Sequence, residues 1–178
     1  MTEYQIIVAD PPWRFASNSK ARPGKNAMRH YECMGVAAIC KLTVPAAKDA
    51  VLFLWATAPF LAHAMDALRA WGFVYKSNMV WDKEKIATGY WVRNEHEHCL
   101  IGRRGKFPTP PPGLRRRSII RGGRREHSRK PDELQEWIDQ AWPIGPRLEM
   151  FARQRREGWD QFGNEADKFS PARGFPPC

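Results

Sequence analysis

The sequence Asp10-Pro11-Pro12-Trp13 combines residue types that suit chemistry on a flat amine. An amino nitrogen on an aromatic ring is a poor nucleophile, because its lone pair is delocalised into the ring. The Asp10 carboxylate and the Pro11 carbonyl can accept hydrogen bonds from its two N–H groups and favour charge on nitrogen. Pro11 and Pro12 fix the backbone, and Trp13 offers a surface for stacking a base. A strand-terminating turn with a core tryptophan is the competing interpretation.

Basic residues are concentrated in one segment. The chain has 178 residues and a net charge of +10, and residues 103–130 hold eleven Lys or Arg but one acidic residue, so the rest of the chain is formally neutral. We predict that this segment contacts nucleic-acid phosphates. An ordinary solvated surface, or a docking site for an acidic protein, is the alternative. The candidate phosphate contacts are Arg115, Arg116, Arg117, Arg121, Arg124 and Arg125.

Apolar runs and helical periodicity predict an α/β protein, with a sheet covered by helices. The first and last expected strands end in polar loops at residues 10–13 and 153–165. Ligands bind beyond the carboxyl ends of strands in such sheets, so these two loops are the expected site. We expect one domain over residues 1–168, with a basic excursion at 103–130 and a disordered tail at 169–178. The expected strands are residues 4–9, 50–55, 73–81, 97–102 and 147–152, and the expected helices are 35–42, 58–71 and 131–142.

Several protein classes fit the sequence poorly. The N-terminus lacks a basic region followed by an apolar stretch, so we expect no signal peptide. The longest uncharged run, residues 50–65, is too short and too polar for a membrane span. The four cysteines lack the CxxC spacing of zinc sites, and a disulfide framework is not indicated. A cytoplasmic protein without a metal is therefore expected.

The segment His96-Glu97-His98-Cys99 superficially resembles a set of metal ligands. Alternate residues of a strand share a face, so two histidines on one metal are geometrically possible. No second cluster of ligands accompanies them, so we expect His98 and Cys99 to pack locally and Glu97 to line the target side of the pocket.

The aromatic residues are expected to divide between core and substrate. Trp91 is compatible with either the core or a surface that faces the substrate. Tyr31, which follows a basic loop, is a candidate for stacking on a base. By their pattern, the expected core tryptophans are Trp55, Trp71, Trp81 and Trp142.

Seven short blocks give the chain a resemblance to a known family. Because these blocks occur in the family's order, the chain resembles the messenger-RNA adenosine N(6)-methyltransferase family (the MT-A, seventy-kilodalton-subunit type), including its small bacterial and phage members. One block alone is weak, but the ordered set is specific and spans residues 4–165. The blocks are DPPW at 10–13, FLW at 53–55, WGF at 71–73, EHCL at 97–100, HSRKPDE at 127–133, LEMFAR at 148–153 and GN at 163–164.

The resemblance implies a Rossmann-like methyltransferase of permuted order, with the catalytic DPPW motif before the cofactor-binding strand. The implied methyl donor is S-adenosylmethionine, and the implied acceptor is the 6-amino group of adenine in nucleic acid. Asp10 is then expected to hold the target amine near the donor's methionine end, and Lys130 to pair with the methionine carboxylate. The other expected donor contacts, around its ribose, are Arg153, Asn164 and Glu165.

Some features depart from the family pattern. Only nine residues precede Asp10, so residues other than an N-terminal segment must complete the pocket for the donor's adenine. Glu165 stands where some relatives have Gln, and Arg155 where His occurs, which leaves a cofactor role for Arg155 in doubt.

Three functions remain open at this stage. They are adenine methylation of DNA, the same reaction on RNA, and a non-catalytic nucleic-acid-binding subunit of a methyltransferase complex. The intact DPPW motif argues against the third. The compact chain, without an accessory RNA-binding module, resembles bacterial or phage members and favours DNA. A homodimer or a heteromeric methyltransferase partner is possible, and a base in a duplex would have to leave the stack.

Overall fold

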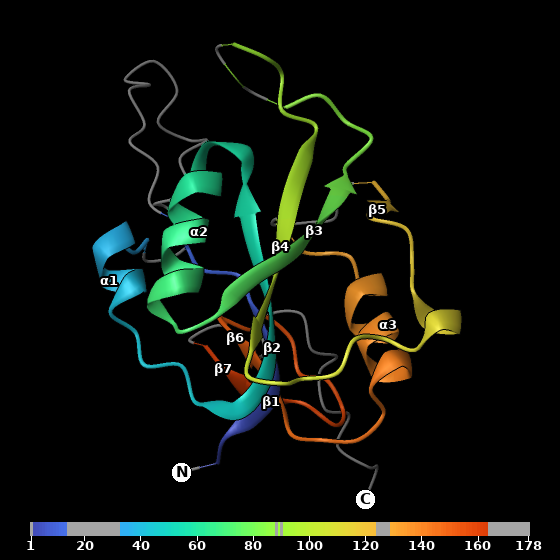
Figure 1. The fold of residues 1–178 in the computed structure, drawn as a ribbon. Helices are drawn as coiled ribbons and strands as arrows, with labels where there is room; N and C mark the ends of the chain where they lie inside the picture. The colour runs from blue at the N-terminus through green and yellow to red at the C-terminus, as the bar shows by residue number, and fades with distance from the viewer. Residues whose placement is uncertain (1, 14–32, 88, 90, 124–128, 164–178) are drawn as a thin grey trace, which may run out of the picture.

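A computed structural model describes residues 2–13, 33–87, 89, 91–123 and 129–163. Its centre is a seven-stranded sheet in the order β5-β3-β4-β2-β1-β6-β7 (Figure 1). Only β4 runs against its neighbours β2 and β3, so the sheet is mostly parallel, as expected. The strands are β1 (Tyr4–Ala9), β2 (Ala46–Thr57), β3 (Val74–Asp82), β4 (His96–Arg104), β5 (Ile119–Arg121), β6 (Arg147–Met150) and β7 (Asp160–Phe162).

Helices cover both faces of this sheet (Figure 1). Helices α1 (Val36–Cys40) and α2 (Leu61–Ala70) lie on one face, and α3 (Glu133–Ala141) lies on the other. Alternate residues of β1 and β2 enter the two cores, which explains why both strands are almost continuously apolar. The α/β prediction is therefore confirmed, and the four tryptophans expected in the core are buried: Trp55, Trp71, Trp81 and Trp142.

The helix after Thr57 begins differently from the expectation. A short 3₁₀ turn, η3 (Ala58–Phe60), comes first, and Thr57 makes no capping hydrogen bond with its side chain. Helix α2 then starts at Leu61 and ends before Gly72, whose φ of 81° is a conformation that glycine adopts without a steric penalty.

Two short strands, β5 and β7, were not expected. Each has three residues, and most of their side chains are exposed, so neither carries a hydrophobic pattern. Backbone pairing with β3 and β6 forms them instead. The strand predicted at 147–152 is consequently not the last one.

The basic segment is also less of an excursion than predicted. Arg103 and Arg104 belong to β4 and pair with β2, while residues 119–121 form the edge strand β5. A second 3₁₀ turn, η4 (Pro112–Leu114), packs beside α3, where the Trp137 indole N–H donates to the Leu114 carbonyl at 2.6 Å. The excursion proper is therefore residues 105–118, because the rest of the described segment belongs to the sheet or leads into α3.

Candidate active site

Asp10 begins the loop at the carboxyl end of β1. The neighbouring strand β6 is parallel to β1, so the two strands end side by side, and the Asp10 N–H donates to the Met150 carbonyl at 3.4 Å. The Pro11 carbonyl accepts the Trp13 N–H at 2.8 Å, which leaves its second lone pair for another donor. The sheet therefore fixes Asp10 at the end of the molecule where ligands of α/β folds bind.

Trp13 does not present the stacking surface that was predicted. Its side chain is 5% exposed, its ring stacks on Phe60 with centroids 5.6 Å apart, and its indole N–H donates to the Trp55 carbonyl at 3.1 Å. The apolar core between β2 and α2 takes up the ring, and its surroundings are not visible in the local sequence. In this structure Trp13 anchors the Asp10 loop to the sheet.

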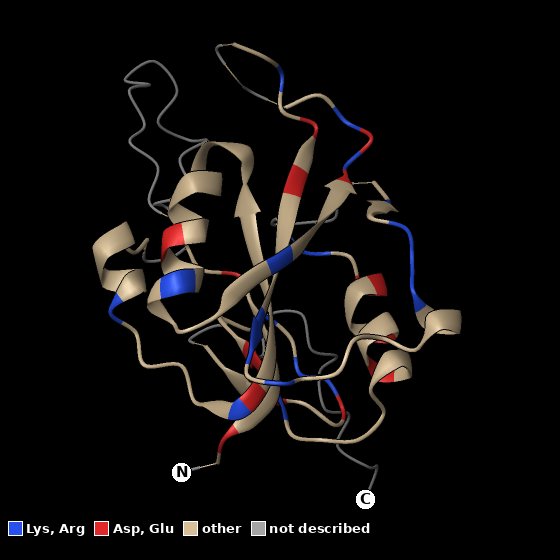
Figure 2. Ribbon diagram, viewed as in Figure 1, with Lys and Arg blue, Asp and Glu red and all other residues tan. Residues whose placement is uncertain are grey.

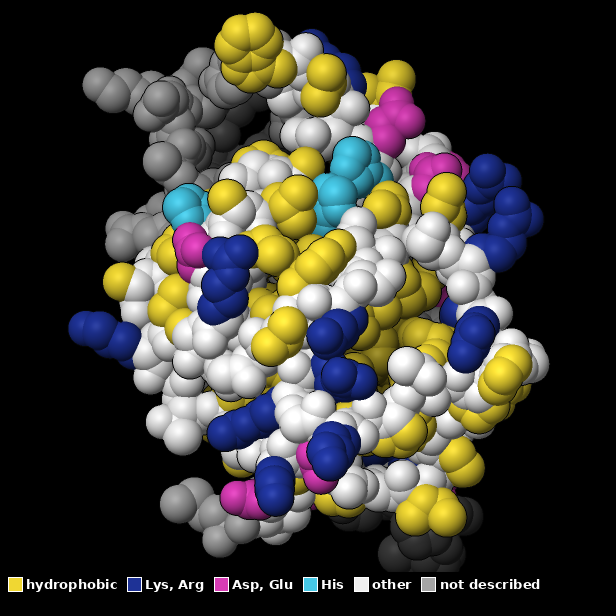
Figure 3. Space-filling view, in the orientation of Figure 1, with side chains coloured by type: hydrophobic (Ala, Val, Ile, Leu, Met, Phe, Trp, Pro, Cys, Tyr) yellow, Lys and Arg dark blue, Asp and Glu magenta, His cyan; other side chains and the backbone are white. Residues whose placement is uncertain are grey.

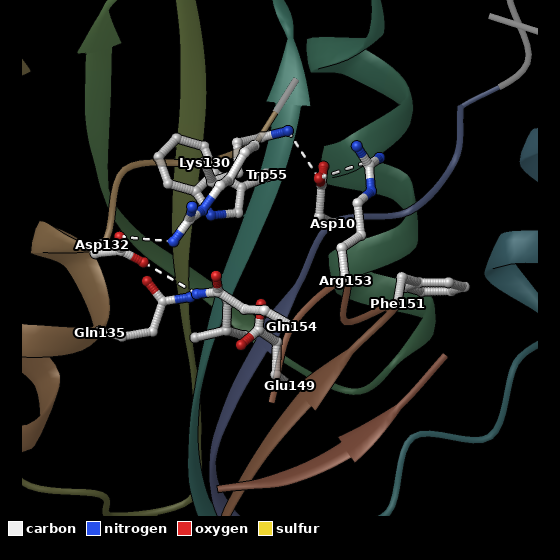
Figure 4. A pocket seen from close by; sticks show the side chains of 11 residues that line it. Asp10, Trp55, Lys130, Asp132, Gln135, Glu149, Phe151, Arg153 and Gln154 are labelled. Carbon is white, nitrogen blue, oxygen red and sulfur yellow. Dashed lines mark hydrogen bonds and ion pairs between the residues drawn. The ribbon is translucent and has the colours of Figure 1, made fainter. Parts of the chain in front are cut away.

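A row of alternating charges surrounds Asp10, and we call it the Asp10 cluster. Its five residues are Lys83, Glu97, Lys130, Asp10 and Arg153. Lys130 Nζ lies 2.7 Å from Asp10 Oδ2 and 3.2 Å from Glu97 Oε2, while Lys83 Nζ lies 2.8 Å from Glu97 Oε1. Arg153 Nη2 lies 3.8 Å from Asp10 Oδ2. Lys130 and Arg153 thus reach Asp10 from opposite sides (Figure 4).

Burial and pairing act against each other within the Asp10 cluster. Burial alone would raise the pKa of Glu97, but Lys130 and Lys83 lower it, and the net pKa is lowered. Burial would likewise lower the pKa of Lys130, but Asp10 and Glu97 raise it, and the net pKa is raised. Both groups therefore stay charged near neutral pH. Because a buried ion is costly without its partners, the geometry of these pairs is tightly constrained.

A second polar group lines the same pocket beside Asp10. Asp132, just before α3, accepts hydrogen bonds from Arg156 at 2.7 Å and from Gln154 at 3.0 Å. Lys130 lies over the Trp55 ring at 5.9 Å, which makes that ring one wall of the pocket. The loop after β6 and the start of α3 are in this way joined around the pocket (Figure 4).

Glu149, in β6, is the most perturbed carboxyl of this pocket. Burial raises its pKa to about 7, against the effect of Arg156. Its Oε2 atom and the Oε1 atom of Gln135 are buried and have no hydrogen-bond partner among the described residues. Two unsatisfied acceptors facing one pocket indicate a site for a donor-bearing ligand.

Residues 4–165 match the model of the MT-A70 family. The chain belongs to the MT-A70 family. It is 30% identical over 181 residues to the type II methyltransferase M.MunI of Mycoplasma sp, an alignment that covers 92% of this chain and 78% of that protein. The mixed α/β sheet agrees with the Rossmann-like methyltransferase fold expected for the family.

Larger relatives match over the same region. An N(6)-adenosine-methyltransferase MT-A70-like protein of Arabidopsis thaliana is 29% identical, with 91% of this chain and 24% of that protein covered. The human N(6)-adenosine-methyltransferase catalytic subunit METTL3 is 27% identical, with 93% and 28% covered. The chain thus spans about a quarter of the length of these two relatives.

In this MT-A70 chain, four of the predicted site residues come together in the Asp10 cluster: Asp10, Glu97, Lys130 and Arg153. Glu97 is placed differently from the expectation. It is 6% exposed and does not line the pocket, because both of its oxygens face lysines, and it touches Asp10 only through Lys130. Five further predicted residues lie outside the described part of the chain: Tyr31, Arg124, Arg125, Asn164 and Glu165.

The remaining predicted arginines lie apart from the pocket. Arg115, Arg116, Arg117 and Arg121 are exposed, on or next to the segment between η4 and β5 (Figure 2). The Arg116 guanidinium donates to the Glu133 carbonyl at 2.5 Å. These arginines therefore do not line the pocket, and their contact with phosphates stays a prediction.

His96 and His98, the two histidines of the segment that resembles metal ligands, lie next to each other on one face of β4. Their Nε2 atoms are 3.3 Å apart, and burial together with the nearby His96 lowers the pKa of His98. Cys99 is buried on the opposite face, and burial raises its pKa. Among the described residues, no three His, Cys, Asp or Glu side chains gather as a metal site requires. In the same part of the chain, no helix is long and apolar enough to span a membrane.

Sequence reasoning missed the inner wall of the pocket, formed by Glu149, Gln135 and Asp132. One signal was available for Glu149, which is a carboxyl between the two apolar residues of its strand, Leu148 and Met150. Gln135 gave a similar signal, because it is buried on a helix whose other buried residues are apolar. A polar residue at an inward position of an element indicates a site when no structural partner is evident.

Proposed function

We propose that this protein is an S-adenosylmethionine-dependent methyltransferase that modifies the 6-amino group of adenine in nucleic acid, with DNA as the favoured acceptor. The observation that carries the proposal is the Asp10 carboxylate held by Lys130 at 2.7 Å, at the carboxyl end of β1, in a chain of the MT-A70 family. Its position matches what transfer to an amine needs: an acceptor that is oriented before the reaction begins.

The residues of the pocket fit the proposed donor. Lys130 and Arg153 supply positive charge for a carboxylate, and Glu149 Oε2 and Gln135 Oε1 are unsatisfied acceptors for an ammonium or hydroxyl group. When bound, S-adenosylmethionine supplies an electrophilic methyl group. We also assign Asn164 and Glu165 to its ribose, on the strength of the family motif alone.

In this proposal the chain itself contributes position and charge. Asp10 accepts a hydrogen bond from one N–H of the adenine amine, and the Pro11 carbonyl accepts from the other. Lys130 and Arg153 hold the Asp10 carboxylate in a fixed orientation, while Glu97 acts on it through Lys130. Holding the amine in line with the methyl group converts an improbable encounter into a favourable geometry.

DNA is placed ahead of RNA for two reasons. The alignment covers 78% of the type II methyltransferase but only about a quarter of the N(6)-adenosine-methyltransferases, so the size of the matched unit agrees better with the former. The resemblance to small bacterial and phage members points the same way. RNA remains the second candidate acceptor. A non-catalytic binding subunit is disfavoured because Asp10, Lys130 and Arg153 are all in place.

The test is transfer of a labelled methyl group from S-adenosylmethionine to four matched substrates: single- and double-stranded DNA and RNA of one adenine-containing sequence. We expect label in at least one DNA substrate and less in RNA. Label confined to RNA would reverse the order of the acceptors. Absence of label from all four, with a folded protein and varied sequences, would contradict the enzymatic proposal.

A further inference from the structure

One tryptophan of this protein differs from the other seven. Trp91 is 100% exposed, whereas none of the other seven tryptophans is more than 9% exposed. Its neighbour Val92 is 70% exposed, and Ile86 on the same connection is 67% exposed. Three large apolar side chains in water on one short connection are unusual for a surface that binds nothing. We call these three residues the Trp91 patch.

The Trp91 patch lies at the same end of the sheet as Asp10. The connection from β3 to β4 carries it. Because β3 is parallel to β1, both strands end at the same edge of the sheet, with β4 and β2 between them. In Figure 1 this connection rises beyond the sheet, and Figure 3 shows hydrophobic side chains at its tip.

The base of the connection is fixed to the Asp10 cluster. The Lys83 N–H donates to the Glu95 carbonyl at 2.8 Å, which closes the connection at its base. The Lys83 ammonium lies 2.8 Å from Glu97, which in turn contacts Lys130. The Trp91 patch is therefore attached to the site through two ion pairs, although it is itself in solvent.

The charges around the patch favour a polyanionic partner. Residues 85–93 contain Lys85 and Arg93, both exposed, and no acidic residue; Glu84 and Glu95 lie at the base. On the neighbouring side, Arg121 of β5 pairs in register with Asp82, at the start of the connection. One exposed arginine of the basic segment, Arg121, therefore lies beside the base of the connection that carries the Trp91 patch.

We propose that Trp91 stacks on a nucleobase adjoining the target adenine, with Lys85 and Arg93 contacting the flanking phosphates. This inference rests on the proposed function. A target base that leaves its stack exposes the face of its neighbour, and an indole at the same end of the sheet can cover that face. Arginine and lysine beside an aromatic ring match the combined charge and π-surface of a nucleic-acid strand.

The test compares Trp91→Ala with Trp91→Phe, which keeps an aromatic face. The control is Ile144→Ala, since Ile144 is 88% exposed but precedes β6, at the opposite end of the sheet. The Kd for an adenine-containing oligonucleotide is measured for each variant, together with the Kd for S-adenosylmethionine. We expect Trp91→Ala to weaken oligonucleotide binding about tenfold to a hundredfold, Trp91→Phe to restore most of it, and the control to change nothing.

A spectroscopic measurement reports the stack directly. The fluorescent base 2-aminopurine is placed beside the target adenine. We expect the wild-type protein to quench its fluorescence and Trp91→Phe to quench it less strongly. With Trp91→Ala, the fluorescence should recover. Donor affinity should be equal in all variants. Oligonucleotide affinity within twofold of wild type in Trp91→Ala would overturn the proposal.

A protein partner is the other possible occupant of the patch. Sedimentation velocity tests a second copy: if Trp91→Ala abolishes a dimer seen for the wild type, the patch is a protein interface and the stacking proposal is wrong. The proposal and the proposed function fail separately. If the wild type transfers methyl groups and Trp91→Ala binds the oligonucleotide normally, only the stacking proposal is overturned. If Trp91→Ala loses oligonucleotide binding but the wild type transfers no methyl group, only the enzymatic proposal is overturned.

Discussion

The Asp10 cluster and the exposed arginines of the basic segment both supply positive charge, but in opposite ways. Lys130, the last residue of that segment, is buried in the Asp10 cluster, whereas the arginines lie in solvent. Lys130 is 12% exposed at its side chain and lies within 3.2 Å of two carboxylates. Arg115 and Arg117 are exposed, next to η4. A buried cation with fixed partners has one orientation, whereas an exposed cation is hydrated, screened by salt and adaptable.

This contrast separates two tasks in recognition and chemistry. Charges that act at a reacting group must be in place beforehand, because reorientation adds to the barrier. Charges that act on phosphates gain from counterion release and need no fixed geometry. We therefore expect changes in the Asp10 cluster to affect turnover and donor binding, and changes in the basic segment to affect nucleic-acid affinity and its dependence on salt.

The largest expected effect is the loss of activity in Asp10→Ala. Removing one preorganised contact to a reacting group costs about a hundredfold to a thousandfold in turnover. The fold should survive, because Lys130 still has Glu97 as a partner at 3.2 Å. Methyl transfer is measured with circular dichroism as the control for folding. Turnover close to wild type in folded Asp10→Ala protein would remove Asp10 from the reaction.

A smaller effect is expected in donor binding for Lys130→Ala. A charge-assisted hydrogen bond is worth about 1.5–3 kcal/mol, so the affinity for S-adenosylmethionine should fall by about tenfold to a hundredfold. Lys130→Arg keeps the charge and should recover part of the loss. Calorimetry gives the affinities, and thermal melting separates a binding defect from loss of the fold. Equal affinity in Lys130→Ala and wild type would contradict the assignment of the donor carboxylate to Lys130.

Glu149 gives a prediction for the dependence of stability on pH. Its pKa is about 7 in the folded chain against an ordinary value of 4.5, so between these values the folded state binds more protons than the unfolded state. Stability should therefore decrease as pH rises from about 4.5 to about 7, by about 1–3 kcal/mol for this group. Glu149→Gln keeps the shape and cannot ionise, so its stability should change less over this range.

Thermal or urea unfolding at pH 5, 6, 7 and 8 measures the difference between the two proteins. A wild-type curve parallel to that of Glu149→Gln would show that Glu149 ionises as in water. Water would then reach the Glu149 carboxyl in spite of its burial in the pocket.

The smallest effect per residue is expected in the basic segment. Replacing Arg115, Arg116 and Arg117 by Ala should flatten the log–log salt dependence of nucleic-acid binding by up to about two or three units, since each phosphate contact contributes about 0.9 for duplex DNA and 0.7 for a single strand. Donor affinity should be unchanged. The matched control removes three other exposed cations, in the variant Lys41→Ala, Lys48→Ala, Arg69→Ala. Equal salt slopes for the two triple variants would indicate that these arginines have no special part in binding.

The sequence predicted the parts of this structure that depend on local pattern. Strands β1 and β2 carry continuous apolar runs, and α3 repeats its apolar residues at helical spacing, so each was found. The Asp10 motif was found because its residue types and its place after β1 are both local. β5 and β7 were missed because each has only three residues, most of them exposed, and is formed only by backbone pairing with a neighbouring strand.

The site was less predictable than the fold for the same reason. Burial of Trp13 depends on Phe60 and Trp55, which the sequence does not bring near it. The hydrogen bonds of Asp132 to Gln154 and Arg156 likewise join α3 to the loop after β6. Pairings across elements are set by packing, and a single sequence contains no direct record of them.

Nucleoside analysis of the methylated product shows directly which base this protein modifies and whether Asp10 is needed. DNA containing both adenine and cytosine is incubated with the protein and S-adenosylmethionine, digested to nucleosides and examined by mass spectrometry, with Asp10→Asn as the matched control. We expect N(6)-methyladenine from the wild type and about a hundredfold less or none from Asp10→Asn. A methyl group on the cytosine amine, or equal N(6)-methyladenine from both proteins, would contradict this expectation.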